Sequence, residues 1–387
     1  MQGVYAWVIF LAILVVGDLV SMKTKARIPM LFTSLFLYLI LIWVGMPKNL
    51  ADVSVIKASG GIVIPMLILH MGTMIPFKEI QRQWKPVIVT LAGLAGILAL
   101  LFGIGQFLVG YPEAVSGAGP IAGGVIATIV TIENLAKKGL TEITVIPAMV
   151  LGLQFLIGIP LSSFFLSKYA QRVKQNMALD KDSVKLNQDV AKQEEAGKKY
   201  FLSGPYETSF TILLTVAIGA SIAVYIGLLT GVDRTIWALF IGMLGAYYGI
   251  YKKDVLTKAN SFGIVSFIIT AYILTLMNDI TPQGIASRAF AIFTILILGT
   301  IGIIIGSYIF AKILRFDPRL AMAVALTAEF GFPANYWISY EVSRSIGDNK
   351  EEEAYILDKV LTPMLVGGYI SVTITSVIIA GILVKTL

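Results

Sequence analysis

Long apolar stretches recur along nearly the whole chain and are separated by short polar segments. Twelve of them occur, six on each side of a polar segment at about 168–206. They lie near residues 4–21, 28–46, 60–76, 86–110, 119–133, 141–167, 207–231, 235–251, 260–278, 287–311, 319–340 and 355–384. A helix needs about 20 predominantly apolar residues to cross a bilayer, whereas membrane-barrel strands alternate over about 10 residues. The pattern therefore predicts an all-α polytopic membrane protein.

The fifth stretch of each half is interrupted by glycine and proline. In the first half the interruption covers residues 116–124, and in the second half it covers residues 327–335. Proline removes a backbone donor and glycine weakens a helix, so we expect both segments to break at membrane depth. Interrupted segments in matching positions of two halves are typical of the binding site of a secondary transporter.

The basic residues predict how these segments lie in the membrane. If both segments enter and return on one side, most of the 30 Lys and Arg residues fall on a single face, as the positive-inside rule requires. Each half then crosses five times, so the halves form inverted repeats. We expect an N-terminal repeat (1–167) with a re-entrant hairpin at about 116–136, a cytoplasmic linker (168–206), and a C-terminal repeat (207–387) with a re-entrant hairpin at about 319–345. The protein is predicted to be a multi-pass protein of the cell inner membrane, with both the N-terminus and the C-terminus on the outer side.

Two blocks of sequence carry a resemblance to a known family. The first is 117–124, followed by 134–136 and 142–160; the second is 329–338, followed by 358–368. Together they resemble the glutamate:sodium symporter family and the related 2-hydroxycarboxylate transporters, and bulky aromatic residues in the second block indicate a divergent member. The resemblance implies sodium-coupled symport of a small organic acid or amino acid, an elevator-type movement of the hairpin-bearing core, and a homodimer.

Glu329 lies in an apolar run just before the second break. A carboxylate at that depth is costly and normally faces a cavity or a partner, so it is a functional candidate. It could be a Na⁺ ligand, or it could carry a proton. The structural alternative is that it caps the broken helix or pairs with a basic residue.

The peptide groups at the breaks form the predicted binding site, because half-helix N-termini favour anionic groups and unwound carbonyls bind hard cations. The predicted substrate-binding residues are Gly119, Pro120, Gly123, Gly124, Gly331, Pro333 and Asn335. The predicted ion-coupling residues are Glu329, Thr327, Thr128, Asp358 and Thr362. The alternative is that the small residues only permit close helix packing, and that the hydroxyl groups only satisfy carbonyls freed by nearby prolines.

Two further polar residues, His70 and Gln154, each lie alone within an apolar stretch. His70 could relay protons or bind substrate, and Gln154 could do the same. A satisfied polar contact between neighbouring helices is the alternative for both residues.

The composition narrows the classes of function. The chain has no Cys and one His, which leaves neither a thiolate metal site nor the Ser-His chemistry of common hydrolases. A membrane-embedded enzyme is therefore the least favoured alternative, and no cofactor is expected beyond Na⁺ as the coupling ion. The net charge of +7 fits basic cytoplasmic loops, so no nucleic-acid partner is expected. A cation/proton antiporter that uses Glu329 is the main alternative to the symporter.

Overall fold

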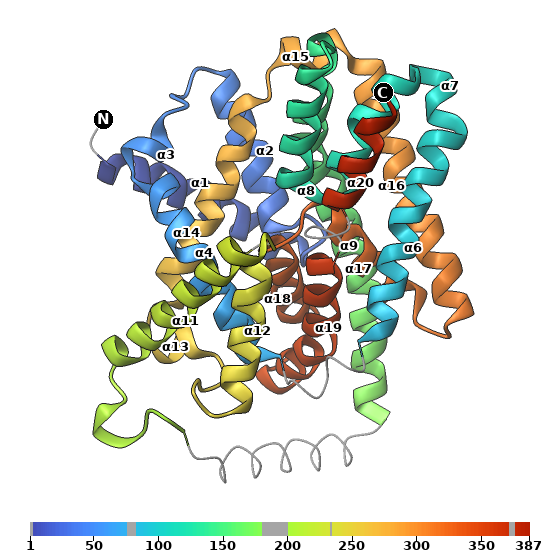
Figure 1. The fold of residues 1–387 in the computed structure, drawn as a ribbon. Helices are drawn as coiled ribbons and strands as arrows, with labels where there is room; N and C mark the ends of the chain where they lie inside the picture. The colour runs from blue at the N-terminus through green and yellow to red at the C-terminus, as the bar shows by residue number, and fades with distance from the viewer. Residues whose placement is uncertain (1–2, 76–82, 180–199, 233, 371–375) are drawn as a thin grey trace. The chain divides into compact units, whose positions relative to one another are not determined.

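A computed structural model describes residues 3–75, 83–179, 200–232, 234–370 and 376–387, and the regular elements within these ranges are helices (Figure 1). The longer helices are α1 (Gly3–Thr24), α2 (Met30–Trp43), α4 (Ile56–Met74), α6 (Trp84–Leu100), α8 (Tyr111–Lys137), α9 (Val145–Leu179), α11 (Ser209–Thr230), α12 (Arg234–Tyr247), α14 (Phe262–Leu274), α16 (Ala289–Ile313), α18 (Ala334–Ile346) and α19 (Lys350–Ile370). The shorter elements are α3 (Leu50–Val53), η1 (Leu101–Gly105), α7 (Gln106–Val109), η2 (Thr141–Ile143), η3 (Gly204–Tyr206), α13 (Val255–Lys258), η4 (Thr275–Asp279), α15 (Pro282–Ser287), α17 (Pro318–Ala325), η5 (Leu326–Glu329), α20 (Ser376–Leu383) and η7 (Val384–Thr386).

Seven helical segments of the described chain are long and apolar enough to cross a membrane. They are Gly3–Thr24, Ile56–Met74, Trp84–Val109, Thr141–Met177, Ser209–Thr230, Phe262–Asp279 and Ala289–Ile313. The prediction of an all-α, multi-pass membrane protein is confirmed at this level. The ten predicted crossings are not all full-length helices in the described chain, since α2 and α12 have only 14 residues each. At about 1.5 Å per residue such a helix covers about 21 Å of a hydrocarbon core that is about 30 Å thick.

The helices form two compact units. Unit 1 comprises residues 1–7, 49–82 and 174–272, and unit 2 comprises residues 8–48, 83–173 and 273–387. In unit 1, α4 packs closely on α12, where Gly72 lies directly against the backbone of Leu239 and Gly242. Small residues at such a contact let two membrane helices approach by their backbones.

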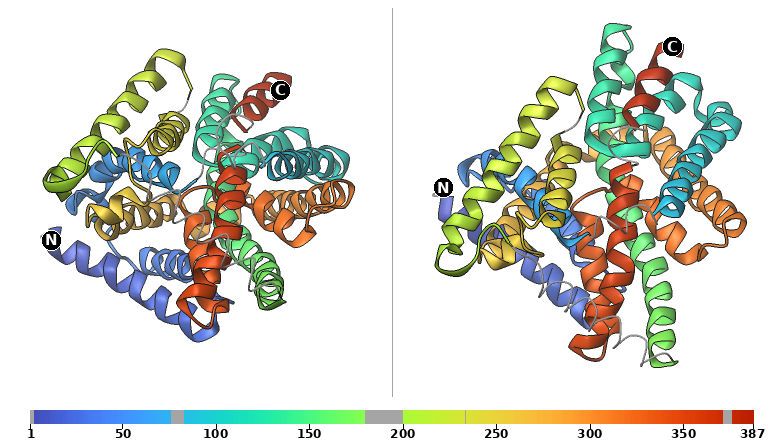
Figure 2. Two further views of the ribbon diagram at one scale, coloured as in Figure 1. Left: turned by 90° about the horizontal axis from the view of Figure 1, so that it is seen from below. Right: turned by 60° about the horizontal axis from the view of Figure 1, so that its bottom comes forward.

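The central helix pair of unit 2 is α6 and α16, which lie side by side in both Figure 1 and Figure 2. Gly96 of α6 faces the carbonyl of Gly302 on α16, and Gly306 faces the carbonyl of Ala92, with no room for a Cβ at either glycine. This glycine-to-backbone packing gives a rigid pair of helices against which the broken segments rest.

Helix α8 is bent back on itself. Gly123 (φ 173°, ψ 41°) and Gly124 (φ 77°, ψ −152°) leave the helical conformation, and the positive φ of Gly124 is one that glycine adopts far more readily than other residues. A Cβ on Gly119 would lie 2.7 Å from Oγ1 of Thr131, so the two arms of α8 pack against each other.

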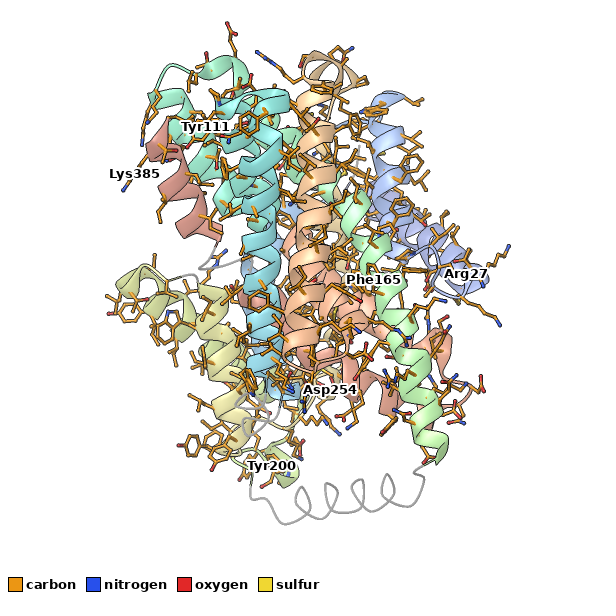
Figure 3. All side chains as sticks on the ribbon, turned by 90° about the vertical axis from the view of Figure 1, so that its right-hand side faces the viewer. Arg27, Tyr111, Phe165, Tyr200, Asp254 and Lys385 are labelled. Carbon is orange, nitrogen blue, oxygen red and sulfur yellow. The ribbon has the colours of Figure 1, made fainter. Side chains whose placement is uncertain are left out.

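Both ends of α8 meet the same C-terminal residues. The hydroxyl groups of Tyr111 and Thr386 are 2.6 Å apart, and Lys138 Nζ donates to the carbonyl of Lys385 at 3.4 Å. Figure 3 shows Tyr111 and Lys385 at one end of the bundle. A straight helix of 27 residues would separate its ends by about 40 Å, so residues 111–137 form a helical hairpin.

The second interrupted segment consists of α17, η5 and α18. Its helix stops at Glu329 and resumes at Ala334, and Gly331 between them has a positive φ of 60°. Both sides of the break approach α19, because Gly367 lies against Val324 and Gly368 lies against Asn335 and Thr327. At the start of α17, Asp317 pairs with Arg172 near the far end of α9, at 3.0 Å.

The predicted linker of residues 168–206 is only partly described. Its first residues continue α9 as far as Leu179, residues 180–199 lie outside the described residues, and the chain resumes at Tyr200. The boundaries of the two predicted repeats therefore remain predictions.

Candidate functional site

Glu329 is a fully buried carboxyl group at the second break, 0% exposed. Its Oε1 accepts a hydrogen bond of 2.6 Å from Oγ1 of Thr300 on α16. Its Oε2 is buried and has no hydrogen-bond partner among the described residues. A buried carboxylate with an unfilled oxygen is costly unless it binds a proton or a cation, so this oxygen marks the candidate site.

The two breaks meet at one turn of α16. Gly299 lies against Ile121, two residues before the Gly123–Gly124 bend of α8, and Thr300 bonds to Glu329. Helix α8 and η5 also pack directly against each other. The segments that the sequence predicts as counterparts are thus neighbours within unit 2.

Helix α9 closes another side of Glu329. A Cβ on Gly158 would lie 2.5 Å from Oε2 of Glu329 and 3.1 Å from Cδ1 of Phe330. One turn further along, Oγ of Ser162 donates to the carbonyl of Ala323 at 3.0 Å. The second broken segment therefore runs along one face of α9.

Asn335 and Thr327 lie together on the α19 side of the break. The amide Nδ2 of Asn335 donates to the carbonyl of Met364 at 3.1 Å, and its Oδ1 accepts from the backbone N–H of Tyr336 at 2.8 Å. The hydroxyl of Thr327 donates to the carbonyl of Val324. Both side chains are 0% exposed, and Gly368 of α19 lies against both of them.

The remaining predicted residues divide into two groups. Thr128 is buried and donates to the carbonyl of Gly124 at 2.9 Å, so it supports the bend of α8. Thr362 is buried on α19, two residues before the carbonyl that Asn335 binds. Asp358 is not brought to the breaks: its side chain is 59% exposed and pairs with Lys359 at 3.6 Å.

The other predicted backbone positions stay at the two breaks. Pro120 is buried in the first arm of α8, and Pro333 directly precedes α18. Two contributors, Thr300 and Gly158, are absent from the sequence-based prediction. Thr300 is one of a few hydroxyl residues in the apolar α16, which is a weak signal, whereas the role of Gly158 needs the packing of α9 against η5.

A second buried carboxyl, that of Glu341, also has one oxygen, Oε1, without a described hydrogen-bond partner, but its other oxygen lies at the start of a helix. Its Oε2 accepts hydrogen bonds from Oγ of Ser21 at 2.7 Å and from the backbone N–H of Met30 at 2.9 Å. Met30 is the first residue of α2, where unpaired N–H groups favour a carboxylate. Close by in sequence, Arg344 pairs with Asp18 at 2.7 Å. These contacts give Glu341 a capping role.

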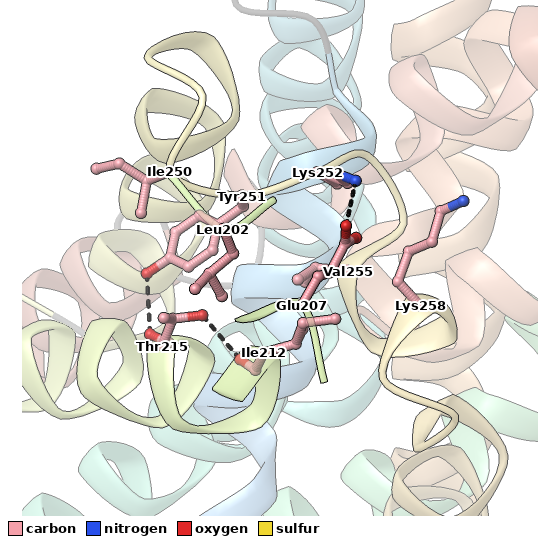
Figure 4. Close-up of a pocket in the computed structure, with 9 residues that line it drawn as sticks. All are labelled: Leu202, Glu207, Ile212, Thr215, Ile250, Tyr251, Lys252, Val255 and Lys258. Atoms are coloured by element: carbon pink, nitrogen blue, oxygen red, sulfur yellow. Dashed lines mark hydrogen bonds and ion pairs between the residues drawn. The ribbon is translucent and has the colours of Figure 1, made fainter. Parts of the chain in front are cut away.

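In unit 1, several polar side chains bind the backbone or side chains of its own loops. His70 is 0% exposed and its Nδ1 accepts the backbone N–H of Leu256 at 3.1 Å. Figure 4 shows a pocket of this unit, where Lys252 pairs with Glu207 at 2.6 Å and the Tyr251 hydroxyl donates to the carbonyl of Thr215. Burial raises the pKa of Tyr251 to about 12, so the hydroxyl remains a donor at physiological pH.

Sequence comparisons with known proteins do not identify a family for this chain. No family model matches the chain, and no curated protein matches it. Among solved structures, one similar chain is that of the sodium proton antiporter MjNhaP1 from Methanocaldococcus jannaschii at pH 8. The two are 16% identical, with a TM-score of 0.38, over 100% of this chain and 99% of the other.

The predicted resemblance to the glutamate:sodium symporter family is wrong. No family model matches the chain, and the similar solved structure is described as a sodium proton antiporter. The Gly- and Pro-rich interruptions that carried the resemblance are general features of transporters with broken helices, so they do not identify one family.

Proposed function

We propose that this chain is a cation/proton antiporter in which the carboxyl of Glu329 binds either a proton or a monovalent cation. The observation that carries the proposal is the buried Oε2 of Glu329, which has no described hydrogen-bond partner and lies where both broken segments meet. A carboxylate at membrane depth normally serves an ion pathway or a proton relay.

The chemistry of the neighbouring groups favours a cation. The hydroxyl of Thr300 donates to Glu329, Gly158 lies against its Oε2, and the helix ends at Glu329 itself, so the peptide groups of the break follow directly in the chain. Oxygen ligands of this kind suit hard cations such as Na⁺, as unwound carbonyls do in transporters with broken helices. The carboxylate gives the site one negative charge, which one proton or one Na⁺ neutralises.

Exchange follows from competition for the same oxygens. A cation can bind only the deprotonated carboxyl, so each binding event releases a proton. At low pH the proton occupies Glu329 and the cation affinity falls, whereas at high pH the cation binds. Antiport results if the site faces one side of the membrane at a time and the unloaded carboxylate does not cross.

The proposal includes hairpins that enter from opposite faces. At the two ends of the α8 hairpin, Tyr111 contacts Thr386 and Lys138 contacts Lys385. Glu113 at the start of the hairpin also pairs with Arg288, which directly precedes α16. Asp317, which opens the second segment, instead pairs with Arg172 at the other end of the 35-residue α9. These contacts support an inverted arrangement, and an elevator-type movement and a homodimer remain predictions.

The earlier expectation of sodium-coupled symport of a small organic acid or amino acid fits this site less well. An organic anion usually requires a guanidinium or ammonium partner. In the described part of unit 2, the buried side chains among Asp, Glu, Lys, Arg and His are the carboxyls of Glu329 and Glu341. The charge at the breaks is thus that of a cation site.

The test uses the purified protein in proteoliposomes that contain a pH-sensitive dye. After acid loading, addition of Na⁺, Li⁺ or K⁺ to the wild type should drive proton efflux, and choline should not. Glu329→Gln should abolish this efflux, because a neutral amide neither releases a proton nor supplies a negative charge to the cation. Glu329→Asp should retain part of the efflux.

The matched control is Glu341→Gln, which changes the other buried carboxyl and leaves the breaks intact. It should retain cation-driven proton efflux. Wild-type efflux in Glu329→Gln, or loss confined to Glu341→Gln, would refute the assignment of Glu329. Uptake of an organic acid without any cation-driven proton movement would favour the symporter.

A further inference from the structure

Gln154 is a buried amide without a described partner. The residue is 0% exposed, and neither its Oε1 nor its Nε2 has a hydrogen-bond partner among the described residues. Burying an amide without a hydrogen bond costs free energy, so such groups in folded proteins usually have a ligand or an ordered water. The amide therefore needs a binding partner.

Gln154 lies on the face of α9 that contacts the second broken segment. Gln154, Gly158 and Ser162 are spaced four residues apart, so they lie on one face of the helix. Ser162 contacts Ala323, and Gly158 contacts Glu329 and Phe330. As the chain proceeds from Ala323 to Phe330, it therefore moves along this face toward Gln154.

The next turn of the same face is at Gln154, about 6 Å beyond Gly158 at a rise of about 1.5 Å per residue. The chain beyond Phe330 is the interrupted part of the segment, where Gly331 has a positive φ and the helix resumes at Ala334. The buried amide thus belongs to a residue one helical turn of α9 from the contact between Gly158 and Glu329.

We infer that Gln154 supplies a further side-chain oxygen of the cation site. In this site the Oε1 atom of Gln154 and the Oε2 atom of Glu329 are both ligands of one dehydrated monovalent cation. The inference rests on the proposed function, because it assigns Gln154 to the same site. A neutral amide oxygen replaces a water ligand without adding charge. The site therefore keeps a one-for-one balance, in which one proton leaves Glu329 as one cation binds.

The inference predicts a specific change in the kinetics of exchange. Gln154→Leu preserves the approximate volume and removes both polar atoms, so the KM for Na⁺ should rise at least tenfold while the maximum rate falls less. Gln154→Asn keeps the amide but shortens its reach, and it should give an intermediate KM with a changed preference among Na⁺, Li⁺ and K⁺. A packing role alone would not change cation preference.

The experiment measures proton efflux from the same proteoliposomes over a range of cation concentrations. Ser163→Ala serves as the matched control, because Ser163 is buried on another face of α9 and donates to the carbonyl of Ala26. The KM of this control should equal that of the wild type. Gel filtration and thermal unfolding of each variant show whether it is folded.

The possible failures of the two proposals are distinguishable. Unchanged KM and cation preference in Gln154→Leu and Gln154→Asn, with active wild type, overturn the role of Gln154 and leave Glu329 in place. No cation-driven proton movement in the wild type overturns both. If Gln154→Leu does not fold, Gln154→Asn decides the question by the cation preference alone.

Discussion

Gly158 on α9 and Glu329 on η5 lie in direct contact: a Cβ at position 158 would be 2.5 Å from Oε2 of Glu329 and 2.8 Å from its Cβ. Separations this short do not occur between real side-chain atoms. The absence of a side chain at Gly158 is therefore what allows the buried carboxyl to lie against α9, and the two residues together define one wall of the candidate site.

Gly158→Ala tests this contact. The added methyl group should displace the carboxyl from Thr300, reduce the rate of cation/proton exchange at least tenfold, and destabilise the fold by about 1–3 kcal/mol, the usual effect of overpacking. Exchange in proteoliposomes and thermal unfolding in detergent measure the two effects. The control is Gly381→Ala on α20, where a Cβ would meet no atom within 4 Å. Wild-type exchange in Gly158→Ala would show that the carboxyl position is unimportant.

Thr300→Val tests the hydrogen bond to Oε1. Valine keeps the shape of threonine and removes the hydroxyl that donates to Glu329 at 2.6 Å. The donor stabilises the charged carboxylate, so its loss should move the half-maximal exchange to higher pH and lower the affinity for the cation. The measurement is the rate of exchange between about pH 6 and pH 9, the range in which a perturbed carboxyl can titrate. Ser307→Ala on the same helix, where the hydroxyl bonds only within α16, should leave the profile unchanged.

The sequence predicts the larger features of this molecule because they depend on local composition. The apolar stretches locate the helices, and glycine and proline locate both breaks, since these residues act on their own backbone. Glu329 is also predictable from local sequence, because a single carboxylate in an apolar run is unusual. The family was mistaken because interrupted helices are common to many transporters.

The contacts that assemble the site depend on tertiary packing. Thr300, Gly158 and the register of η5 along α9 involve residues from distant parts of the chain, and no local pattern specifies which helices meet. Asp358 illustrates the same limit, since its position beside a membrane proline suggests a site residue, whereas its side chain is largely exposed.

Gly124→Ala tests the bend of α8. Gly124 has a φ of 77° and a ψ of −152°, a conformation that is essentially restricted to glycine and costs other residues about 1–3 kcal/mol. The variant should unfold at a lower temperature and lose exchange, because the bend carries Ile121 toward Gly299. Gly103→Ala, at a site with no atom within 4 Å of the added Cβ, should retain both stability and exchange. A Gly124→Ala variant as stable as the wild type would mean that the bend differs from the one described.

Cysteine accessibility tests the two hairpins, and the native chain is suited to it because it contains no cysteine. Single variants are made at Tyr111 and Lys138, which flank the α8 hairpin, and at Arg315 and Lys350, which flank the second segment. In sealed vesicles of one orientation, a membrane-impermeant maleimide should label Tyr111→Cys and Lys138→Cys from one side. It should label Arg315→Cys and Lys350→Cys only from the other side.

This labelling pattern distinguishes the arrangements directly. A segment that crosses the membrane places its two flanks on opposite sides, whereas a hairpin places them on the same side. Tyr111 contacts Thr386 and Lys138 contacts the adjacent Lys385, so the cysteines at positions 111 and 138 should be labelled from the same side. Opposite labelling within that pair would contradict the α8 hairpin itself. Labelling of all four positions from one face would leave both hairpins intact but remove the inverted arrangement, and with it the alternating access that the proposed antiport requires.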